Sequence, residues 1–421
     1  MLELFPDSAA VEDGELAVEG IRASALADEF GTPLLVYSEP ALRRAAQAYR
    51  RSAPDALVAY SVKAFPNVAV LRLFAAEGLG ADVSTLGELA YAVRAGIPGT
   101  GIVFHGNNKS SEELRAAAEH DVGLVVLDAL DEINLAAEAG VPRVLVRATP
   151  GIDAETHDAI KTAHHGSKFG LPPDQALEAI ARARDASLEP VGLHVHIGSQ
   201  LLDLGAERMT VDWLAGFAAE CRAELGWTPE IVDLGGGLGI QYVEDEPAPA
   251  IEDFVGALLQ RVERAWALHD LPAPTLVLEP GRSLVGRAGF TLYRVGTVKR
   301  VSDATVYAAV DGGMSDNPRP HLYGARYAAL LANRADEEPA GRFAIAGKHC
   351  ESGDVLIERV QLPEPRRDDL LAVPGTGAYT LGMASNYNAV PRPAAVLIGG
   401  GATTLIRRRE TIDDLLADEP Q

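Results

Sequence analysis

The sequence predicts an α/β protein that combines a TIM-like (β/α)8 barrel with a second, mostly β domain. From about residue 57 to 288, apolar β-runs alternate with helical runs, and there are eight such β-runs. After residue 288, short β-runs follow one another with few helices between them. Strict alternation of β and α units implies a parallel sheet, and eight units imply a closed barrel.

The barrel strands come from short apolar runs that end in polar residues. Helical patterns lie between them, and Ser110 and Glu113 form a capping box that opens the helix after the third strand. Residues 206–226 form a long amphipathic helix. The predicted strands are 57–62, 80–84, 101–106, 123–128, 143–148, 191–197, 230–235 and 275–280.

The change of pattern after residue 288 sets the predicted domains. Residues 39–288 form the barrel domain, and residues 1–38 with 289–421 form the β-rich domain. The run "GTPLLVYS" (31–38) is a strand that precedes the first barrel helix. We therefore expect the N-terminal segment to pair with the second domain.

Composition excludes several classes of protein. The chain has 421 residues, 47% of them hydrophobic, and a net charge of −23, so it can bury a large core and should not bind nucleic acid or an anionic membrane surface. No signal-peptide pattern and no long apolar stretch occur, so we expect a cytosolic protein with a small diffusible substrate. Cys221 and Cys350 are too few for a disulfide framework or a thiolate metal cluster.

Polar residues follow several of the predicted strands. Active sites in a barrel of this kind lie at the carboxyl ends of the strands, so these residues can share one pocket. They are Lys63 after strand one, His105, Asn107 and Asn108 after strand three, His196 and Ser199 after strand six, Gly235, Gly236 and Gly237 after strand seven, and Glu279 and Arg282 after strand eight.

Two of these motifs have more than one interpretation. "HVH" (194–196) places two histidines on one strand face, which suits a metal, but a third and fourth ligand are not evident, so no metal is predicted. A metal-dependent barrel hydrolase remains an alternative. The glycines of "DLGGGLGI" do not have the dinucleotide spacing G-x-G-x-x-G; they form either a phosphate cradle or a tight turn.

Lys63 and Glu279 each end an apolar run. Lys63 either extends to the surface or forms a Schiff base. Glu279 either makes a structural ion pair with a barrel arginine or pairs with a protonated ring nitrogen, since a buried carboxylate needs a cationic partner. A lysine, a carboxylate and a phosphate cradle together describe pyridoxal phosphate.

Seven motifs in order make this interpretation specific. The chain resembles the fold-type III, alanine-racemase-like pyridoxal-phosphate decarboxylases, and within them the diaminopimelate decarboxylases, over nearly its whole length. The motifs are "YSVKA", "HVHIGSQ", "DLGGGLGI", "EPGRSLV", "DNPRPHLYGARY", "CESGD" and "GAYTLGMASNYN".

The resemblance implies roles for individual residues. Lys63 and Cys350 would be catalytic, with Lys63 bonded to the cofactor, Glu279 on its ring nitrogen and His196 stacked on its ring. The other cofactor-binding residues would be Ser199, Gly236, Gly237, Pro280, Gly281, Arg282 and Tyr379. The substrate-binding residues would be Arg282, Arg319, Tyr323, Glu351 and Tyr379.

The resemblance also implies a reaction and an assembly. The reaction would convert meso-2,6-diaminopimelate to L-lysine and CO2, the last step of lysine biosynthesis, with pyridoxal 5'-phosphate as cofactor. The protein would be a homodimer whose active sites are shared between two chains. An ornithine or arginine decarboxylase, an amino-acid racemase and a non-catalytic pyridoxal-binding protein are the alternatives on the same scaffold.

Overall fold

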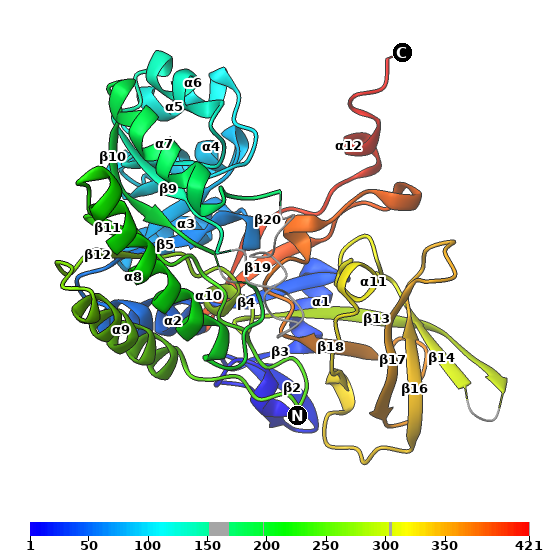
Figure 1. Ribbon diagram of the computed structural model, residues 1–421. Helices are drawn as coiled ribbons and strands as arrows, with labels where there is room; N and C mark the ends of the chain where they lie inside the picture. Colours follow the sequence, from blue (N-terminus) through cyan, green and yellow to red (C-terminus); the bar gives the residue numbers. More distant parts are fainter. Residues whose placement is uncertain (151–167, 197, 303–304, 421) are drawn as a thin grey trace. The chain divides into compact units, whose positions relative to one another are not determined.

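The chain is divided into two compact units. The structure is a computed structural model that describes residues 1–150, 168–196, 198–302 and 305–420 (Figure 1). One unit comprises Ala45–Gly239 and Ala248–Ser283, and the other Met1–Arg44, Ile240–Pro247 and Leu284–Gln421. The domain bounds expected from the sequence, 39–288 for the barrel, stay a prediction.

The first unit contains a closed barrel of eight parallel strands, in the order β10-β11-β12-β5-β6-β7-β8-β9. The predicted barrel is therefore confirmed. All the strands except β10 lie inside the predicted runs; β10 begins two residues before its run. The strands are β5 (Leu57–Ser61), β6 (Gly80–Val83), β7 (Ile102–Phe104), β8 (Leu124–Leu127), β9 (Arg143–Arg147), β10 (Glu189–His194), β11 (Ile231–Asp233) and β12 (Thr275–Leu278).

Helices follow the barrel strands and begin at polar caps. The Asn67 side chain accepts from two N–H groups of α3, and Thr85 caps α4. The predicted capping box of Ser110 and Glu113 is present at the start of α5. The helices are α3 (Val68–Ala76), α4 (Leu86–Ala95), α5 (Ser111–Glu119), α6 (Glu132–Ala139), α7 (Pro173–Asp185), α8 (Gly205–Leu225) and α9 (Ile251–Leu268), with α2 (Glu39–Ser52) before β5.

Apolar side chains fill the barrel interior. Small and branched residues dominate, which is how an eight-stranded barrel becomes a packed core and not a pore. Because these side chains fill the interior, an active site can form only at the ends of the barrel. The interior cluster comprises Ala59, Val103, Leu124, Val126, Leu145, Val191 and Val277.

The second unit is mostly β, as predicted. Its main sheet runs β17-β16-β14-β13-β4-β19-β20, and β18 pairs with β13 and β15. In it β4, the predicted N-terminal strand, lies between β13 and β19. The strands are β4 (Leu34–Ser38), β13 (Gly289–Ser302), β14 (Thr305–Val310), β15 (Leu330–Leu331), β16 (Gly341–Ala346), β17 (Val355–Leu362), β18 (Leu370–Pro374), β19 (Ala394–Gly399) and β20 (Ala402–Arg407).

Shorter elements complete the second unit. A three-stranded sheet near the N-terminus consists of β1 (Ala10–Glu12), β2 (Glu15–Val18) and β3 (Ile21–Arg22), and helix α1 (Ala23–Phe30) follows it. Helices α11 (Arg319–Tyr323) and α12 (Ile412–Leu416) are one turn or little more, as is α10 (Arg282–Val285), which begins in the first unit and ends in the second.

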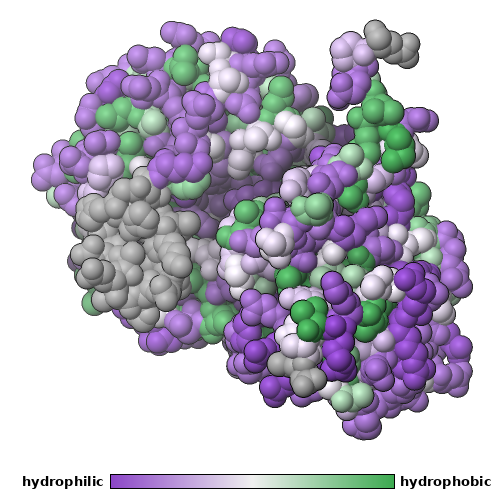
Figure 2. Space-filling view, turned by 90° about the vertical axis from the view of Figure 1, so that its right-hand side faces the viewer, coloured by the Kyte–Doolittle hydropathy of each residue, from purple (hydrophilic) through white to green (hydrophobic). Residues whose placement is uncertain are grey.

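The surface agrees with the charge of the chain. On the face drawn in Figure 2, hydrophilic side chains predominate and apolar side chains lie in small groups. Among the described residues, no helix combines the length and the apolar character that crossing a bilayer requires.

Candidate active site

Lys63 lies at the carboxyl end of β5, in a short 3-10 turn (Val62–Ala64). Its side chain is about half exposed, and its Nζ is 3.8 Å from Oδ2 of the buried Asp82 at the end of β6. Ser61 donates a hydrogen bond of 2.5 Å to the same carboxylate oxygen. The ammonium at this strand end therefore faces a fixed carboxylate and is open to a ligand.

Glu279 follows β12 and pairs with a histidine. The His105 Nε2 lies 2.5 Å from Glu279 Oε1, and the two residues are 6% and 7% exposed. Burial by itself would raise the pKa of Glu279, but His105 and His194 outweigh it and hold that pKa well below its usual value. The partner is thus a histidine and not the barrel arginine considered from the sequence.

Two more buried groups complete a cluster around Glu279. One donor atom from each of His105, His194, Asp233 and Glu279 lies within 4.8 Å of the others. Burial lowers the pKa of His194 to about 3 and raises that of Asp233 well above its usual value. His194 is therefore a neutral imidazole and Asp233 favours its protonated form.

The glycines after β11 lie too close to their neighbours for any side chain. A Cβ at Gly236 would stand 2.3 Å from the Glu279 carbonyl oxygen, and one at Gly237 would stand 2.7 Å from Leu201. Gly237 also has a φ of +123°, which disfavours other residues. The sequence left a cradle or a plain turn open; close packing and a positive φ explain why glycine stands here and do not by themselves distinguish the two.

Ser199 and Arg282 lie at the same end of the barrel. The Arg282 Nη2 donates to Ser199 Oγ at 2.9 Å; Ser199 is exposed and Arg282 is partly buried. The Pro280 carbonyl oxygen accepts from the Ser61 N–H at 3.1 Å, which joins the segment after β12 to β5. His196 is partly buried, and burial together with Lys63 lowers its pKa well below the usual value.

These barrel residues fit pyridoxal phosphate. A lysine at one strand end, an ionised buried carboxylate at another, and glycine N–H groups with a hydroxyl match the carbonyl, ring nitrogen and phosphate of that cofactor. Neither nitrogen of the neutral His194 ring makes a hydrogen bond among the described residues. The ring lies beside Glu279 and adds a polar group to the site.

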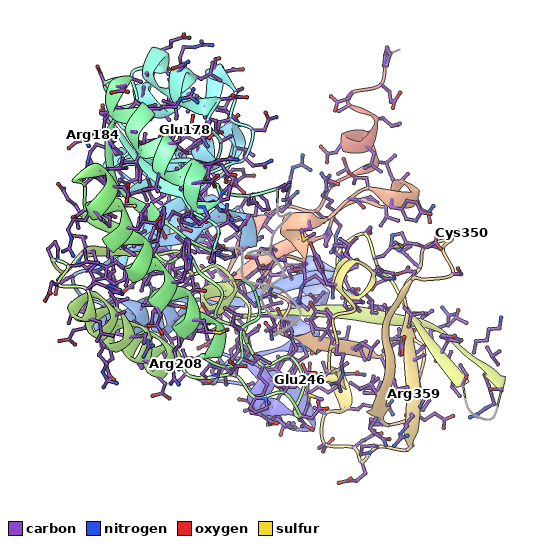
Figure 3. The ribbon with its side chains drawn as sticks, in the orientation of Figure 1. Glu178, Arg184, Arg208, Glu246, Cys350 and Arg359 are labelled. Atoms are coloured by element: carbon purple, nitrogen blue, oxygen red, sulfur yellow. The ribbon has the colours of Figure 1, made fainter. Side chains whose placement is uncertain are left out.

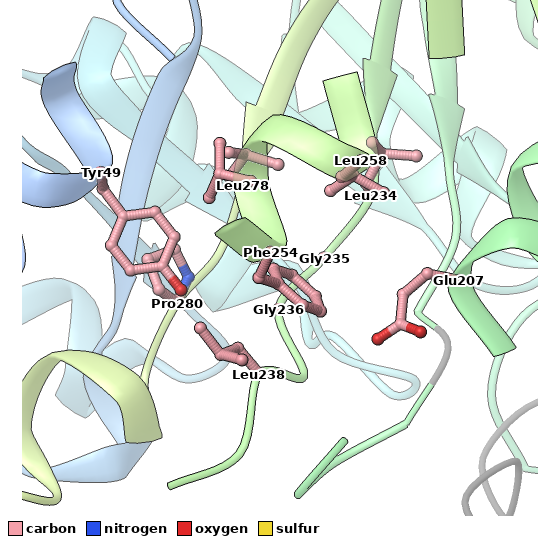
Figure 4. A pocket seen from close by; sticks show the side chains of 11 residues that line it. Tyr49, Glu207, Leu234, Gly235, Gly236, Leu238, Phe254, Leu258, Leu278 and Pro280 are labelled. Atoms are coloured by element: carbon pink, nitrogen blue, oxygen red, sulfur yellow. The ribbon is translucent and has the colours of Figure 1, made fainter. Parts of the chain in front are cut away.

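A small cavity adjoins these glycines. Gly235 and Gly236 form part of its wall together with Leu234, Leu278 of β12 and apolar residues of α9, and Glu207 of α8 also borders it (Figure 4). Glu207 is 1% exposed, and neither carboxylate oxygen has a hydrogen-bond partner among the described residues. Burial raises its pKa to about 7.

The remaining predicted site residues belong to the second unit. Cys350 is exposed on the loop between β16 and β17 (Figure 3), and Glu351 beside it is exposed too. Tyr323 at the end of α11 is 65% exposed. Tyr379 has a φ of +57°, a left-handed conformation that is costly outside glycine and concentrates at functional sites.

Arg319 is buried and not a surface residue of its loop. Its guanidinium lies 4.4 Å from the centre of the Tyr242 ring and 5.5 Å from that of Tyr327, and it donates to the Tyr327 hydroxyl. Aromatic faces and a phenol oxygen thus hold this cation in a fixed place.

The sequence did not single out the acids Asp82 and Asp233 or the role of His194. Both acids stand inside apolar strand runs, "GADVS" and "EIVDLG", which is the same signal that drew attention to Glu279. Arg147 at the end of β9 is a further buried charge; it pairs with Asp128 at 3.4 Å.

The fold and this site together define a pyridoxal-dependent decarboxylase. The family described as "Pyridoxal-dependent decarboxylase, pyridoxal binding domain" matches residues 40–286. The diaminopimelate decarboxylase of Bacillus subtilis is 42% identical over 96% of this chain and 95% of its own, and that of Actinosynnema pretiosum is 45% identical over 99% and 95%. A crystal structure of the M. jannaschii diaminopimelate decarboxylase in co-complex with L-lysine is 35% identical, with a TM-score of 0.92 over 99% of this chain and 98% of that one.

The chain belongs to the diaminopimelate decarboxylase family. It is a carboxy-lyase, and its cofactor is pyridoxal 5'-phosphate. The metal-dependent hydrolase considered from "HVH" is therefore set aside in favour of the pyridoxal enzyme.

Proposed function

We propose that this chain removes CO2 from meso-2,6-diaminopimelate and releases L-lysine, the last step of lysine biosynthesis. Relatives of that name share 42% and 45% of residues over nearly the full length. The observation that carries the chemistry is the buried His105–Glu279 pair at the same barrel end as Lys63.

The barrel residues bind and orient the cofactor. The bound cofactor supplies an electron sink for the bond that breaks. Lys63 holds it at β5, and the N–H groups around Gly236 and Gly237, with Ser199 and the segment Pro280, Gly281 and Arg282, take its phosphate. The negative charge of the buried Glu279 carboxylate keeps the adjacent ring nitrogen protonated, because an opposite charge nearby favours the charged form of a group. His196 covers the ring, and this cofactor-binding domain spans residues 39–288.

The second domain supplies substrate contacts and a proton. Decarboxylation breaks the bond from Cα to its carboxylate, CO2 leaves, and a proton takes the vacated place; Cys350 is the donor. Arg319 and Arg282 face the distal carboxylate, which matches the planar fork of a guanidinium, and Glu351 takes the distal ammonium. Tyr323 and Tyr379 border the substrate.

The assembly is a homodimer in which each site uses Lys63 of one chain and Cys350 of the other. The resemblance of "CESGD" to the family motif supports this arrangement. A cytosolic location fits the exposed free thiol of Cys350, since such thiols persist in reducing compartments.

An assay of CO2 release tests the function. The purified protein with pyridoxal phosphate is given meso-diaminopimelate, ornithine, arginine and lysine in turn, and CO2 and the amine product are measured. Diaminopimelate should react fastest and yield L-lysine. Faster CO2 release from any of the other three would overturn the substrate assignment, and a colourless protein that loses its activity to chelators would overturn the cofactor chemistry as well.

A further inference from the structure

We propose that His105 is a positioning residue for the cofactor ring: it holds the Glu279 carboxylate in the orientation and charge state that the ring nitrogen requires. This inference rests on the proposed function and assigns a role to a residue that the reaction itself does not use. It is carried by the geometry of the cluster around Glu279.

His105 is fixed at its backbone and at its ring. Its backbone N–H donates to the Val83 carbonyl oxygen at 2.7 Å, which fixes the end of β7 against β6. Its ring meets the His194 ring edge-on, with centroids 4.7 Å apart and planes at 65°. A ring fixed in this way can hold Glu279 in one orientation through the 2.5 Å bond from Nε2.

The other groups around Glu279 do not replace this contact. His194 Nε2 is 3.6 Å from Glu279 Oε2, beyond a hydrogen bond. Asp233 accepts from the Gly235 N–H at 2.8 Å and also interacts with Glu279, but as an acid it supplies no positive charge. The remaining charged or titratable groups that act on this cluster are Lys63, Asp82, Glu88, Arg147 and His196.

The balance of charge makes His105 decisive. Asp82 and Glu279 are acidic groups with almost no exposure, and Arg147 is already paired with Asp128. A buried carboxylate that loses its charge-assisted donor takes up a proton instead of staying ionised. Without His105, Glu279 would therefore be a neutral acid, and a neutral acid no longer stabilises a protonated ring nitrogen.

The test compares two ligands that differ at one atom. Pyridoxal phosphate and its deaza analogue, in which carbon replaces the ring nitrogen, are titrated into the cofactor-free protein, and binding is followed by absorbance and by intrinsic fluorescence. The variants are His105→Leu, which removes the donor, and His105→Gln, which keeps a neutral donor. His120→Leu, at an exposed histidine that ends α5, is the matched control.

The expected result is a loss confined to the ligand with a ring nitrogen. His105→Leu should weaken binding of pyridoxal phosphate by about tenfold or more, the value of a charge-assisted hydrogen bond, and leave the analogue unchanged. His105→Gln should weaken binding of pyridoxal phosphate less, and should again leave binding of the analogue unchanged. Each variant tests the role of His105 independently, so one of them suffices if the other does not fold.

Equal losses for the two ligands would mean that His105 only supports the fold, and unchanged binding of both would mean that it does not act on the ring. Either result overturns the inference and leaves the proposed function intact. Failure of the wild-type protein to bind pyridoxal phosphate at all would instead overturn the proposed function.

Discussion

Asp354 accepts two hydrogen bonds from His349, one from the backbone N–H at 2.9 Å and one from ring Nδ1 at 2.7 Å. It accepts a third from the Met314 N–H at 2.8 Å, and both Asp354 and His349 are buried. Cys350 follows His349 directly, and its N–H donates to Asn388 Oδ1 at 2.7 Å. One buried carboxylate thus fixes the loop that presents the exposed thiol.

Asp354→Asn should therefore loosen that loop. The amide keeps the shape but replaces one acceptor oxygen by an NH2 group, so at least one of the three donors loses its acceptor, and an unsatisfied buried group costs about 1–3 kcal/mol. We expect a lower thermal midpoint, by about 4 °C or more, and faster alkylation of Cys350 by iodoacetamide. Asp418→Asn, at an exposed acid, is the control, and an alkylation rate equal to that of the wild type would contradict this role.

Lys63→Ala should remove both activity and the visible absorbance of the bound cofactor. A lysine bonded to pyridoxal phosphate gives a band at roughly 420 nm that borohydride bleaches. Lys299→Ala changes an exposed lysine of β13 and should keep both properties. Retention of the band and of turnover in Lys63→Ala would rule out Lys63 as the anchoring residue.

Mixing two inactive variants should restore activity. If each site takes Lys63 from one chain and Cys350 from the other, a hybrid dimer of one Lys63→Ala chain and one Cys350→Ala chain has one site in which both residues are intact. Random exchange in an equal mixture gives about one quarter of the wild-type activity, because half of the dimers are hybrids with one good site of two. Hybrids no more active than their parents would show that each site lies within one chain.

Arg319→Met should raise KM for diaminopimelate by about tenfold or more, since a charge-assisted pair with a carboxylate is worth roughly 1.5 to 3 kcal/mol. Because Arg319 also lies against Tyr242 and Tyr327, the unfolding midpoint must be measured in parallel. Arg319→Lys keeps the positive charge but loses the planar guanidinium group that can make two parallel hydrogen bonds to a carboxylate. An unchanged KM in a folded Arg319→Met protein would assign this arginine to packing alone.

Glu207 should make stability depend on pH. Its pKa in the folded protein is raised to about 7 by burial, above an unfolded value near 4.5. Its contribution to stability is therefore complete below pH 4.5 and is lost as the pH rises through about 7. Above that pH the cost is on the order of 3 kcal/mol, at 1.36 kcal/mol per pKa unit.

Urea unfolding of the wild type and Glu207→Gln at several pH values measures this effect. The advantage of the variant should grow between pH 4.5 and 7 and then stay constant. Glu220→Gln, at the exposed Glu220 of the same helix, should show no such trend. A pH-independent difference between Glu207→Gln and the wild type would mean that Glu207 has a partner that keeps it ionised.

The sequence predicts the barrel well because alternation is a local signal. Each apolar run and each capped helix is specified within some ten residues, and the order of the strands follows from parallel connections. It predicts less of the β-rich unit: the run "GRFAIA" of β16 is short and begins with polar residues, and the short strands β1 to β3 lie in mixed polar sequence.

Within the site, the sequence identifies residues but not their partners. Lys63 and Glu279 stand out because a charge ends an apolar run. That Glu279 meets His105, 174 residues earlier, depends on which strand ends the closed barrel brings together, and no local pattern encodes this. The acid beside Lys63, Asp82, carries the same local signal as Glu279, but its place next to Lys63 depends on the pairing of β5 with β6.

The position of β4 has a consequence for synthesis of the chain on the ribosome. All barrel strands are complete at Leu278, but the fully buried residues Leu34–Ser38 lie between β13 and β19, and β19 ends at Gly399, about 120 residues later. The barrel can close while the rest is still being made, and β4 can then pair with β13, but its other edge stays open until β19 is made, near the end of the chain. A strand edge that stays open so long is exposed to other nascent chains, so shielding of these five residues by a chaperone matters until β19 is in place.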